Sequence, residues 1–148
     1  MEINMILGKN PKVKVLNFGF SEVNFTNIIS LAKVFDKMAV IDILAGTIDV
    51  NDLCIDKCKE ASLSIKQNEE YADIDVRKQV DDKTLLQALL LIQEMEPEQL
   101  NITIFPKDDF EKYYCKINVL YYENVATVFC DRSICKKEIL KLFDDCFK

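Results

Sequence analysis

The chain has 148 residues, a mass of 17.1 kDa and a formal net charge of −6, with no His and only three Gly. Without His, it cannot build a Ser-His-Asp triad, a Cys-His pair or a His-ligated zinc site. Three widely spaced glycines also exclude the glycine-rich loops that bind dinucleotides or phosphates.

The first third of the chain predicts a strand, a helix and a second strand. Residues 12–20, KVKVLNFGF, are rich in β-branched and aromatic side chains, which is typical of a strand. Its apolar positions change face near Leu16, so the strand is either buried on both faces or interrupted there by a bulge. Ser21–Asp36 repeats apolar residues at helical spacing. Ala39–Leu44 is a short apolar run that predicts a strand, and Gly46 is expected to end it.

The middle third predicts a helix, a strand and a second helix. The first helix is expected to run from Asp49 or Asn51 to about Lys66, because apolar residues recur along it at helical spacing. Ala72–Arg77 alternates apolar and charged residues, which indicates a strand with one solvent-facing side near a sheet edge. Lys83–Glu96 is the clearest helix, since it is rich in Leu, Gln and Ala. Its expected cap is Asp81 or Asp82.

The last third predicts a strand at Asn101–Phe105, a hairpin and a C-terminal helix that ends near Cys146. Together the elements predict an α+β fold. We expect a single domain over residues 1–148, built from a mostly antiparallel sheet of five or six strands and about four helices.

The hairpin pattern predicts its own register. A two-residue turn at Glu123-Asn124 places Tyr122 opposite Val125 and gathers apolar side chains on one face. The other face is mixed and holds Tyr122, Val125 and Phe129. If no helix covers this mixed face, it is an exposed aromatic patch and a candidate interface.

The six cysteines are expected to be reduced. We recognise no export signal and no membrane span, so we expect a cytoplasmic protein. Zinc binding would require Cys54, Cys58, Cys130 and Cys135 to converge, and their spacing departs from the usual C-x2-C pattern. We therefore expect no metal and no cofactor. In the expected register Cys115 is diagonal to Cys130 and too distant for an unstrained disulfide.

The surplus of negative charge falls in the middle third. Residues 51–100 carry twelve acidic and six basic side chains, whereas residues 1–50 carry five of each and residues 101–148 carry eight of each. An acidic surface repels nucleic acids and membranes and attracts a basic partner. We therefore expect binding to neither nucleic acid nor membrane.

These observations predict a small acidic protein-binding module and no enzyme. An inhibitor or immunity-type protein that docks a basic partner, such as a toxin nuclease, fits this charge. The first alternative is a structural or assembly protein that forms a homodimer through the hairpin face or the Ala72–Val80 edge. The second is a thiol- or metal-dependent enzyme. No catalytic residues are assigned, and the residues expected to form one outward-facing binding patch are Glu69, Glu70, Tyr71, Asp73, Asp75, Asp81 and Asp82.

Overall fold

The structure is a computed structural model that describes residues 12–148. It contains one antiparallel sheet in the order β1-β7-β6-β5-β2-β4-β3, together with four α-helices and one short 3₁₀ helix. The α+β class is thereby confirmed, although the sheet has seven strands rather than five or six. The strands are β1 (Val13–Gly19), β2 (Val40–Asp49), β3 (Ser64–Gln67), β4 (Tyr71–Gln79), β5 (Gln99–Phe105), β6 (Cys115–Leu120) and β7 (Val125–Asp131). The helices are α2 (Phe25–Phe35), η1 (Val50–Asp52), α3 (Ile55–Glu60), α4 (Leu85–Glu94) and α5 (Lys137–Cys146).

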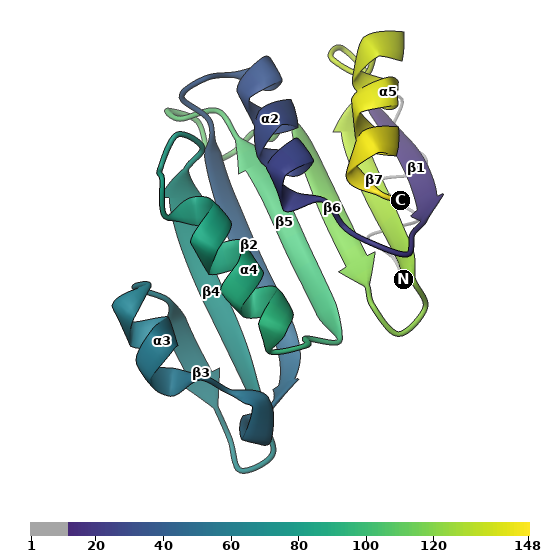
Figure 1. The fold of residues 1–148 in the computed structure, drawn as a ribbon. Coiled ribbons are helices and arrows are strands. Elements are labelled where there is room, and N and C mark those ends of the chain that lie inside the picture. The colour runs from purple at the N-terminus through teal and green to yellow at the C-terminus, as the bar shows by residue number, and fades with distance from the viewer. Residues whose placement is uncertain (1–11) are drawn as a thin grey trace.

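The core lies between the sheet and three of the helices. Helices α2, α4 and α5 all lie on one face of the sheet, whereas α3 lies beside the edge formed by β3 (Figure 1). Alternate strand residues such as Ile43, Ile74 and Ile102 point to that face and are almost fully buried. Within residues 12–148, no helix is both long and apolar enough to cross a lipid bilayer.

The segment that follows α3 departs from the predicted helix. The helix expected to reach Lys66 ends at Glu60, because Ser62 adopts a left-handed backbone conformation with φ of 59°. The chain then forms β3, which pairs with β4 over only four residues. Ile65 matches the helical spacing of the preceding apolar residues, so its pattern did not reveal the strand.

Strand β2 is longer than predicted, because Gly46 does not end it. The pairing of β2 with β4 shifts between Ala45 and Ile48, which marks a bulge. Thr47, with φ of 61°, sits in this bulge and donates its backbone N–H to the Asp73 carboxylate at 3.1 Å. The bulge lets the strand continue to Asp49 with Ile48 still buried.

The hairpin between β6 and β7 has a longer turn than predicted. Leu120, not Tyr122, lies opposite Val125, and the four residues 121–124 form the turn, in which Asn124 has φ of 54°. The shift is two residues, so the predicted division into an apolar and a mixed face is preserved. It also places Cys115 directly opposite Cys130 rather than diagonal to it.

Strand β1 pairs with β7 in a continuous register, so the alternative of a bulge near Leu16 is wrong. Leu16 and Phe18 pack against the core, while Val13 is 7% exposed on the opposite face. The change of face in the sequence therefore reflects apolar side chains on both sides of one regular strand.

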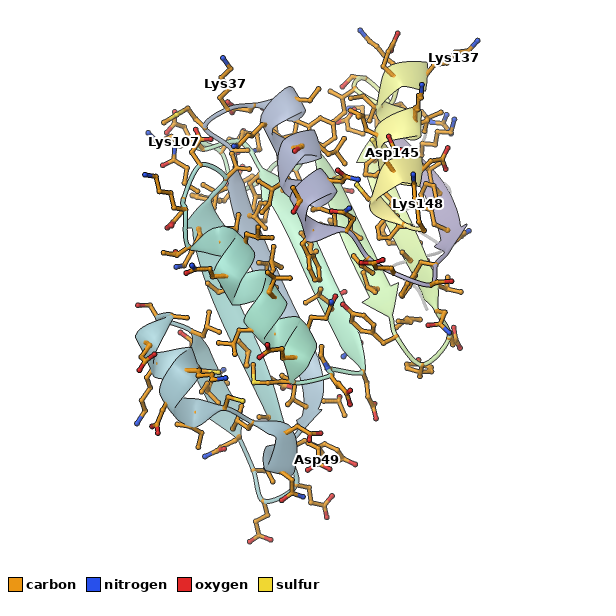
Figure 2. The ribbon with its side chains drawn as sticks, viewed as in Figure 1. Lys37, Asp49, Lys107, Lys137, Asp145 and Lys148 are labelled. Carbon is orange, nitrogen blue, oxygen red and sulfur yellow. The ribbon has the colours of Figure 1, made fainter. Side chains whose placement is uncertain are left out.

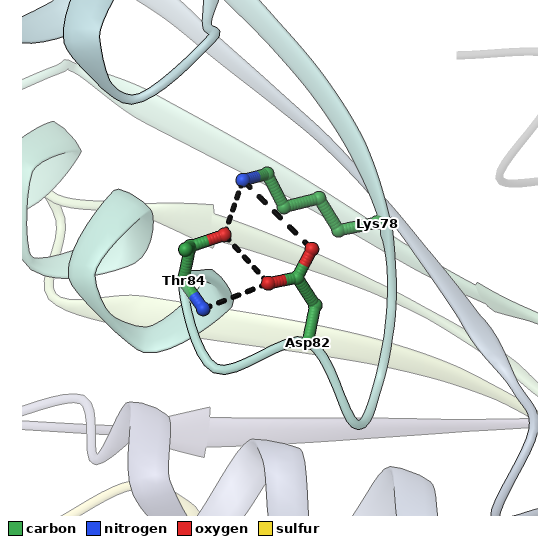
Figure 3. Close-up of polar contacts among 3 residues, drawn as sticks. All are labelled: Lys78, Asp82 and Thr84. Atoms are coloured by element: carbon green, nitrogen blue, oxygen red, sulfur yellow. Dashed lines mark hydrogen bonds and ion pairs between the residues drawn. The ribbon is translucent and has the colours of Figure 1, made fainter.

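Asp82 fixes the start of α4 (Figure 3). Its carboxylate accepts hydrogen bonds from the backbone N–H of Thr84 at 2.8 Å and from the Thr84 hydroxyl at 2.6 Å. The Lys78 ammonium donates to the same hydroxyl and lies 4.0 Å from the Asp82 carboxylate. The hydrogen bonds from Thr84 hold the pKa of Asp82 below its ordinary value. The N-cap residue of α4 is Thr84, so neither predicted cap occupies that position. Asp82 holds Thr84 through the bonds above, whereas Asp81 forms an ion pair with Lys33 at 3.5 Å.

We expect the substitution Asp82→Ala to lower the free energy of unfolding by about 1 kcal/mol at neutral pH, as the loss of a side-chain hydrogen bond does. Because the folded pKa of Asp82 is lowered, its contribution is complete above the unfolded pKa and is lost as the pH falls through the folded pKa. Urea unfolding of both proteins should therefore show a difference that shrinks in strong acid. Asp81→Ala is the control, since an exposed ion pair contributes only a few tenths of a kcal/mol. An equal loss in the two variants would show that the hydrogen bonds from Thr84 to Asp82 do not stabilise the start of α4.

Candidate functional site

The structure does not bring the seven predicted partner-binding residues together. They divide among the β3–β4 turn, the helix-free face of β4 and the connection that follows β4. Strand β4 has nine residues, so its two ends are about 27 Å apart at 3.4 Å per residue. The single contiguous patch expected from the sequence does not form. The three groups are Glu69 and Glu70; Tyr71, Asp73 and Asp75; and Asp81 and Asp82.

Asp73 and Asp75 take part in contacts within the sheet. Besides accepting the Thr47 N–H, Asp73 lies opposite Lys66 of β3. Burial, followed by the neighbouring carboxylate of Asp42, raises the pKa of Asp75. These carboxylates are therefore engaged by neighbours from β2 and β3.

Asp42 is a polar residue of this face that the sequence analysis did not single out. One carboxylate oxygen lies 3.3 Å from the Arg77 guanidinium, which itself stacks 4.9 Å from the Phe110 ring centroid and 5.8 Å from that of Phe105. The other oxygen is buried and has no hydrogen-bond partner in the described chain. A charged residue inside the apolar run Ala39–Leu44 was the signal available in the sequence.

A larger concentration of charge lies at one end of the sheet. Antiparallel strands place every second connection at the same end, and here five connections meet: residues 20–24, 50–54, 68–70, 95–98 and 121–124. None of them contains Lys or Arg. We call their seven exposed carboxylates the acidic end: Glu22, Asp52, Glu69, Glu70, Glu96, Glu98 and Glu123.

The connections of the acidic end are joined to one another by backbone hydrogen bonds. The N–H of Val50 donates to the carbonyl of Glu70 at 3.1 Å, and the N–H of Tyr121 donates to the carbonyl of Glu98 at 3.0 Å. Phe20 donates in the same way to Asn124 at 2.9 Å. These bonds hold the charged side chains on a shared, ordered framework.

The opposite end of the sheet is electrically balanced. Its four connections, residues 36–39, 80–84, 106–114 and 132–136, carry six acidic and six basic side chains. Figure 2 shows Lys37, Lys107 and Lys137 at this end and Asp49 at the other. The ion pairs found among residues 12–148 include no carboxylate of the acidic end. Seven carboxylates without an ion pair are therefore concentrated at one end, where Lys148 also lies: its N–H donates to the Glu22 carbonyl at 3.0 Å, and its ammonium pairs with Asp145 at 3.6 Å.

Two hollows at the acidic end combine carboxylates with an exposed tyrosine. Both tyrosines present a large rigid ring to solvent, with Tyr71 44% exposed and Tyr122 67% exposed. The first hollow, of about 320 Å³, is lined by Asp49, Val50, Asn51, Glu69, Glu70 and Tyr71. The second, of about 460 Å³, is lined by Gln93, Glu96, Pro97, Glu98, Tyr121 and Tyr122.

Tyr121 forms the inner wall of the second hollow. Its ring meets Phe20 edge-on at 5.9 Å, and its hydroxyl is buried without a hydrogen-bond partner in the described chain. Burial raises the pKa of Tyr121 to about 12, so the phenol stays protonated at neutral pH.

The four cysteines that a zinc site would require do not converge. Cys54 and Cys58 lie at α3, beyond β4, whereas Cys130 and Cys135 lie at β7 and the connection that follows it, near the other edge of the sheet (Figure 1). In the region that the structure describes, no three or more Cys, His, Asp or Glu residues are arranged to hold a metal ion. All six cysteines are free thiols.

The two surfaces suggested for a homodimer, the mixed hairpin face and the Ala72–Val80 edge, are less exposed to solvent or to a new strand than expected. No helix of the described chain covers the mixed hairpin face, yet Phe129 is only 7% exposed there, so the face is not an aromatic patch. β3 pairs with Ala72–Asp75, which leaves Val76–Gln79 as the part of β4 without a strand on that side. Whether the chain forms a homodimer stays a prediction.

Comparison with models of known protein families, with curated proteins and with solved structures gives no match.

Proposed function

We propose that this protein is a binding module that docks a basic protein through its acidic end. The observation that carries the proposal is the concentration of seven exposed, unpaired carboxylates in connections that contain no Lys or Arg. Charge of one sign gathered at one end of a molecule steers an oppositely charged partner and orients it at encounter. A surface needed only for solubility would gain nothing from this concentration.

The two hollows supply the chemistry for specific contacts. A carboxylate beside an aromatic ring favours a Lys or Arg side chain, which can form an ion pair and a cation–π contact at once. Exposed tyrosines are also frequent anchors at protein interfaces. We propose that basic side chains of the partner enter beside Tyr71 and Tyr122.

The proposed surface keeps part of the sequence prediction. Glu69, Glu70 and Tyr71 belong to it, whereas Asp73, Asp75, Asp81 and Asp82 contact other residues of the chain. An inhibitor that covers the phosphate-binding groove of a toxin nuclease remains the partner class that fits this charge, since such grooves are basic. Two copies would repel each other at this end, so the charge favours a different partner over a homodimer.

The proposal is tested by titrating the protein with a fluorescently labelled oligo-arginine peptide and following anisotropy. We expect binding that weakens as salt is added. The double variants Glu69→Lys/Glu70→Lys and Glu96→Lys/Glu98→Lys should each weaken it about tenfold, which corresponds to about 1.4 kcal/mol. Tyr122→Ala should weaken it without any change of charge.

The matched control is Asp108→Lys/Glu111→Lys, which changes the net charge equally at the balanced end. It should leave binding nearly unchanged, because charges further away than about 10 Å are largely screened at about 0.1 M salt. If this control weakened binding as much as the acidic-end variants, net charge alone would explain the attraction and the proposed surface would be wrong. Absence of any binding to the peptide would also overturn it.

We further propose that the protein acts in the cytoplasm. Six cysteines in a chain of this size, expected to stay as thiols, fit a reducing compartment, which supports this location.

A further inference from the structure

The two longest stretches of the chain without a charged residue lie side by side in the fold. They are residues 23–32 and 84–93. The first forms most of α2 and the second forms nearly all of α4, and these helices contact each other on the same face of the sheet (Figure 1). Helices at a protein surface usually carry charged side chains on the side that faces solvent. The surface shared by α2 and α4 departs from that pattern.

A hollow of about 270 Å³ opens between the two helices. Residues 22–26, at the start of α2, line one side, and Leu86, Leu90 and Gln93 of α4 line the other. These three α4 residues follow the spacing i, i+4 and i+7, so they share one side of the helix over about 10 Å. Leu90 is 48% exposed and Leu86 is half-buried. The hollow therefore presents an apolar wall to solvent.

This hollow continues into the acidic end. Gln93 also lines the second hollow, which contains Tyr122, so the two hollows adjoin. We call them together the α2–α4 groove. Its lining includes no Lys or Arg, and its charged residues are three glutamates of the acidic end: Glu22, Glu96 and Glu98. At the balanced end, Lys33 of α2 and Asp81 form an ion pair at 3.5 Å, which bridges the two helices.

The combination of an apolar wall and carboxylates at one end selects among occupants. An amphipathic helix with Lys or Arg beyond one end of its apolar face matches both features. A second copy matches poorly, because a two-fold interface brings the same patch of both copies together and the glutamates would face one another. An anionic lipid surface is repelled by the same charge.

We propose that the α2–α4 groove binds an amphipathic helix of the basic partner. Apolar side chains of that helix, spaced i and i+4, cover Leu86 and Leu90. Basic side chains at its end reach Glu96 and Glu98 beside Tyr122. This inference rests on the proposed function, and it adds which kind of partner segment docks and where its apolar face lies.

The test uses two fluorescently labelled peptides that end in the same short run of arginines. One has an alanine-rich helical segment with leucines spaced i and i+4, and in the other Gln replaces each Leu. Anisotropy titrations should show that the protein binds the leucine peptide about tenfold more tightly, since burial of a leucine is worth at least that factor. Oligo-arginine, which lacks an apolar face, reports on the acidic end alone.

The variant Leu90→Gln should remove the difference between the two peptides and leave the affinity for oligo-arginine unchanged. It keeps the net charge, and Leu and Gln have similar helix propensities. Val34→Gln is the matched control, because Val34 is 60% exposed on α2 and lies outside both hollows. It should leave all three affinities unchanged. Glu96→Lys/Glu98→Lys should weaken the binding of both peptides and of oligo-arginine.

Equal affinity for the two peptides would overturn the groove, while binding of oligo-arginine would still support the acidic end. Absence of oligo-arginine binding would instead overturn the proposed function. Equal losses in Leu90→Gln and Val34→Gln would show that the leucine peptide binds apolar surface without selecting the groove. Leucine-peptide binding that Glu96→Lys/Glu98→Lys leaves intact would contradict a basic partner helix. A dimer found by light scattering and dissociated by Leu90→Gln would identify a second copy as the occupant. Far-UV circular dichroism checks that Leu90→Gln keeps the fold.

Discussion

The substitution Phe143→Ala should lower the free energy of unfolding by about 3–5 kcal/mol, the usual cost of emptying a buried aromatic site. Phe143 is fully buried and is among the largest side chains of the core. Its ring lies 6.3 Å from that of Phe18, so it joins α5 to β1. In a chain of this size such a loss lowers the melting temperature on the order of 10 °C.

The stability lost in Phe143→Ala should come from the cavity at this position and not from displacement of α5, because hydrogen bonds from other residues keep the helix in place. The Asn27 side chain donates to the Asp145 carbonyl at 2.8 Å, and the Asn24 N–H donates to the Cys146 carbonyl at 2.8 Å. Phe143→Leu should cost less than Phe143→Ala, since Leu fills part of the cavity. Asp144→Ala, on the exposed side of the same helix, should change stability by less than about 0.5 kcal/mol. Urea unfolding that showed equal effects at positions 143 and 144 would contradict the packing of α5.

Elements with a wide apolar face were predictable from the sequence, because local periodicity and burial agree in them. The helix expected at Lys83–Glu96 is α4, and the helix expected at Ser21–Asp36 is α2 with a later start. Strand β3 was not predictable in this way. It is held by pairing with β4, a partner several residues further along the chain, and only Ile65 of its four residues is even partly buried.

The same limit explains the error in the candidate site. A count of charge along the sequence found Glu69 and Glu70, because they are neighbours in the chain. It missed Glu22, Glu98 and Glu123, because only the alternation of antiparallel strands brings these residues to one end.

The register of the β6–β7 hairpin was predicted wrongly for a related reason. Both turn lengths keep the same faces, so hydrophobic pattern alone cannot distinguish them.

The second large effect is expected at Leu89, where Leu89→Ala should lower the free energy of unfolding by about 2–5 kcal/mol. Leu89 is fully buried between α4 and the sheet, whereas its neighbour Leu90 is 48% exposed. Leu90→Ala removes the same atoms from a surface position and should cost less than about 0.5 kcal/mol. The two variants share composition, helix propensity and charge, so urea unfolding compares burial alone. Similar losses of stability at the two positions would mean that α4 does not pack against the sheet through Leu89. The position of the second hollow, which lies at the end of α4, would then be wrong as well.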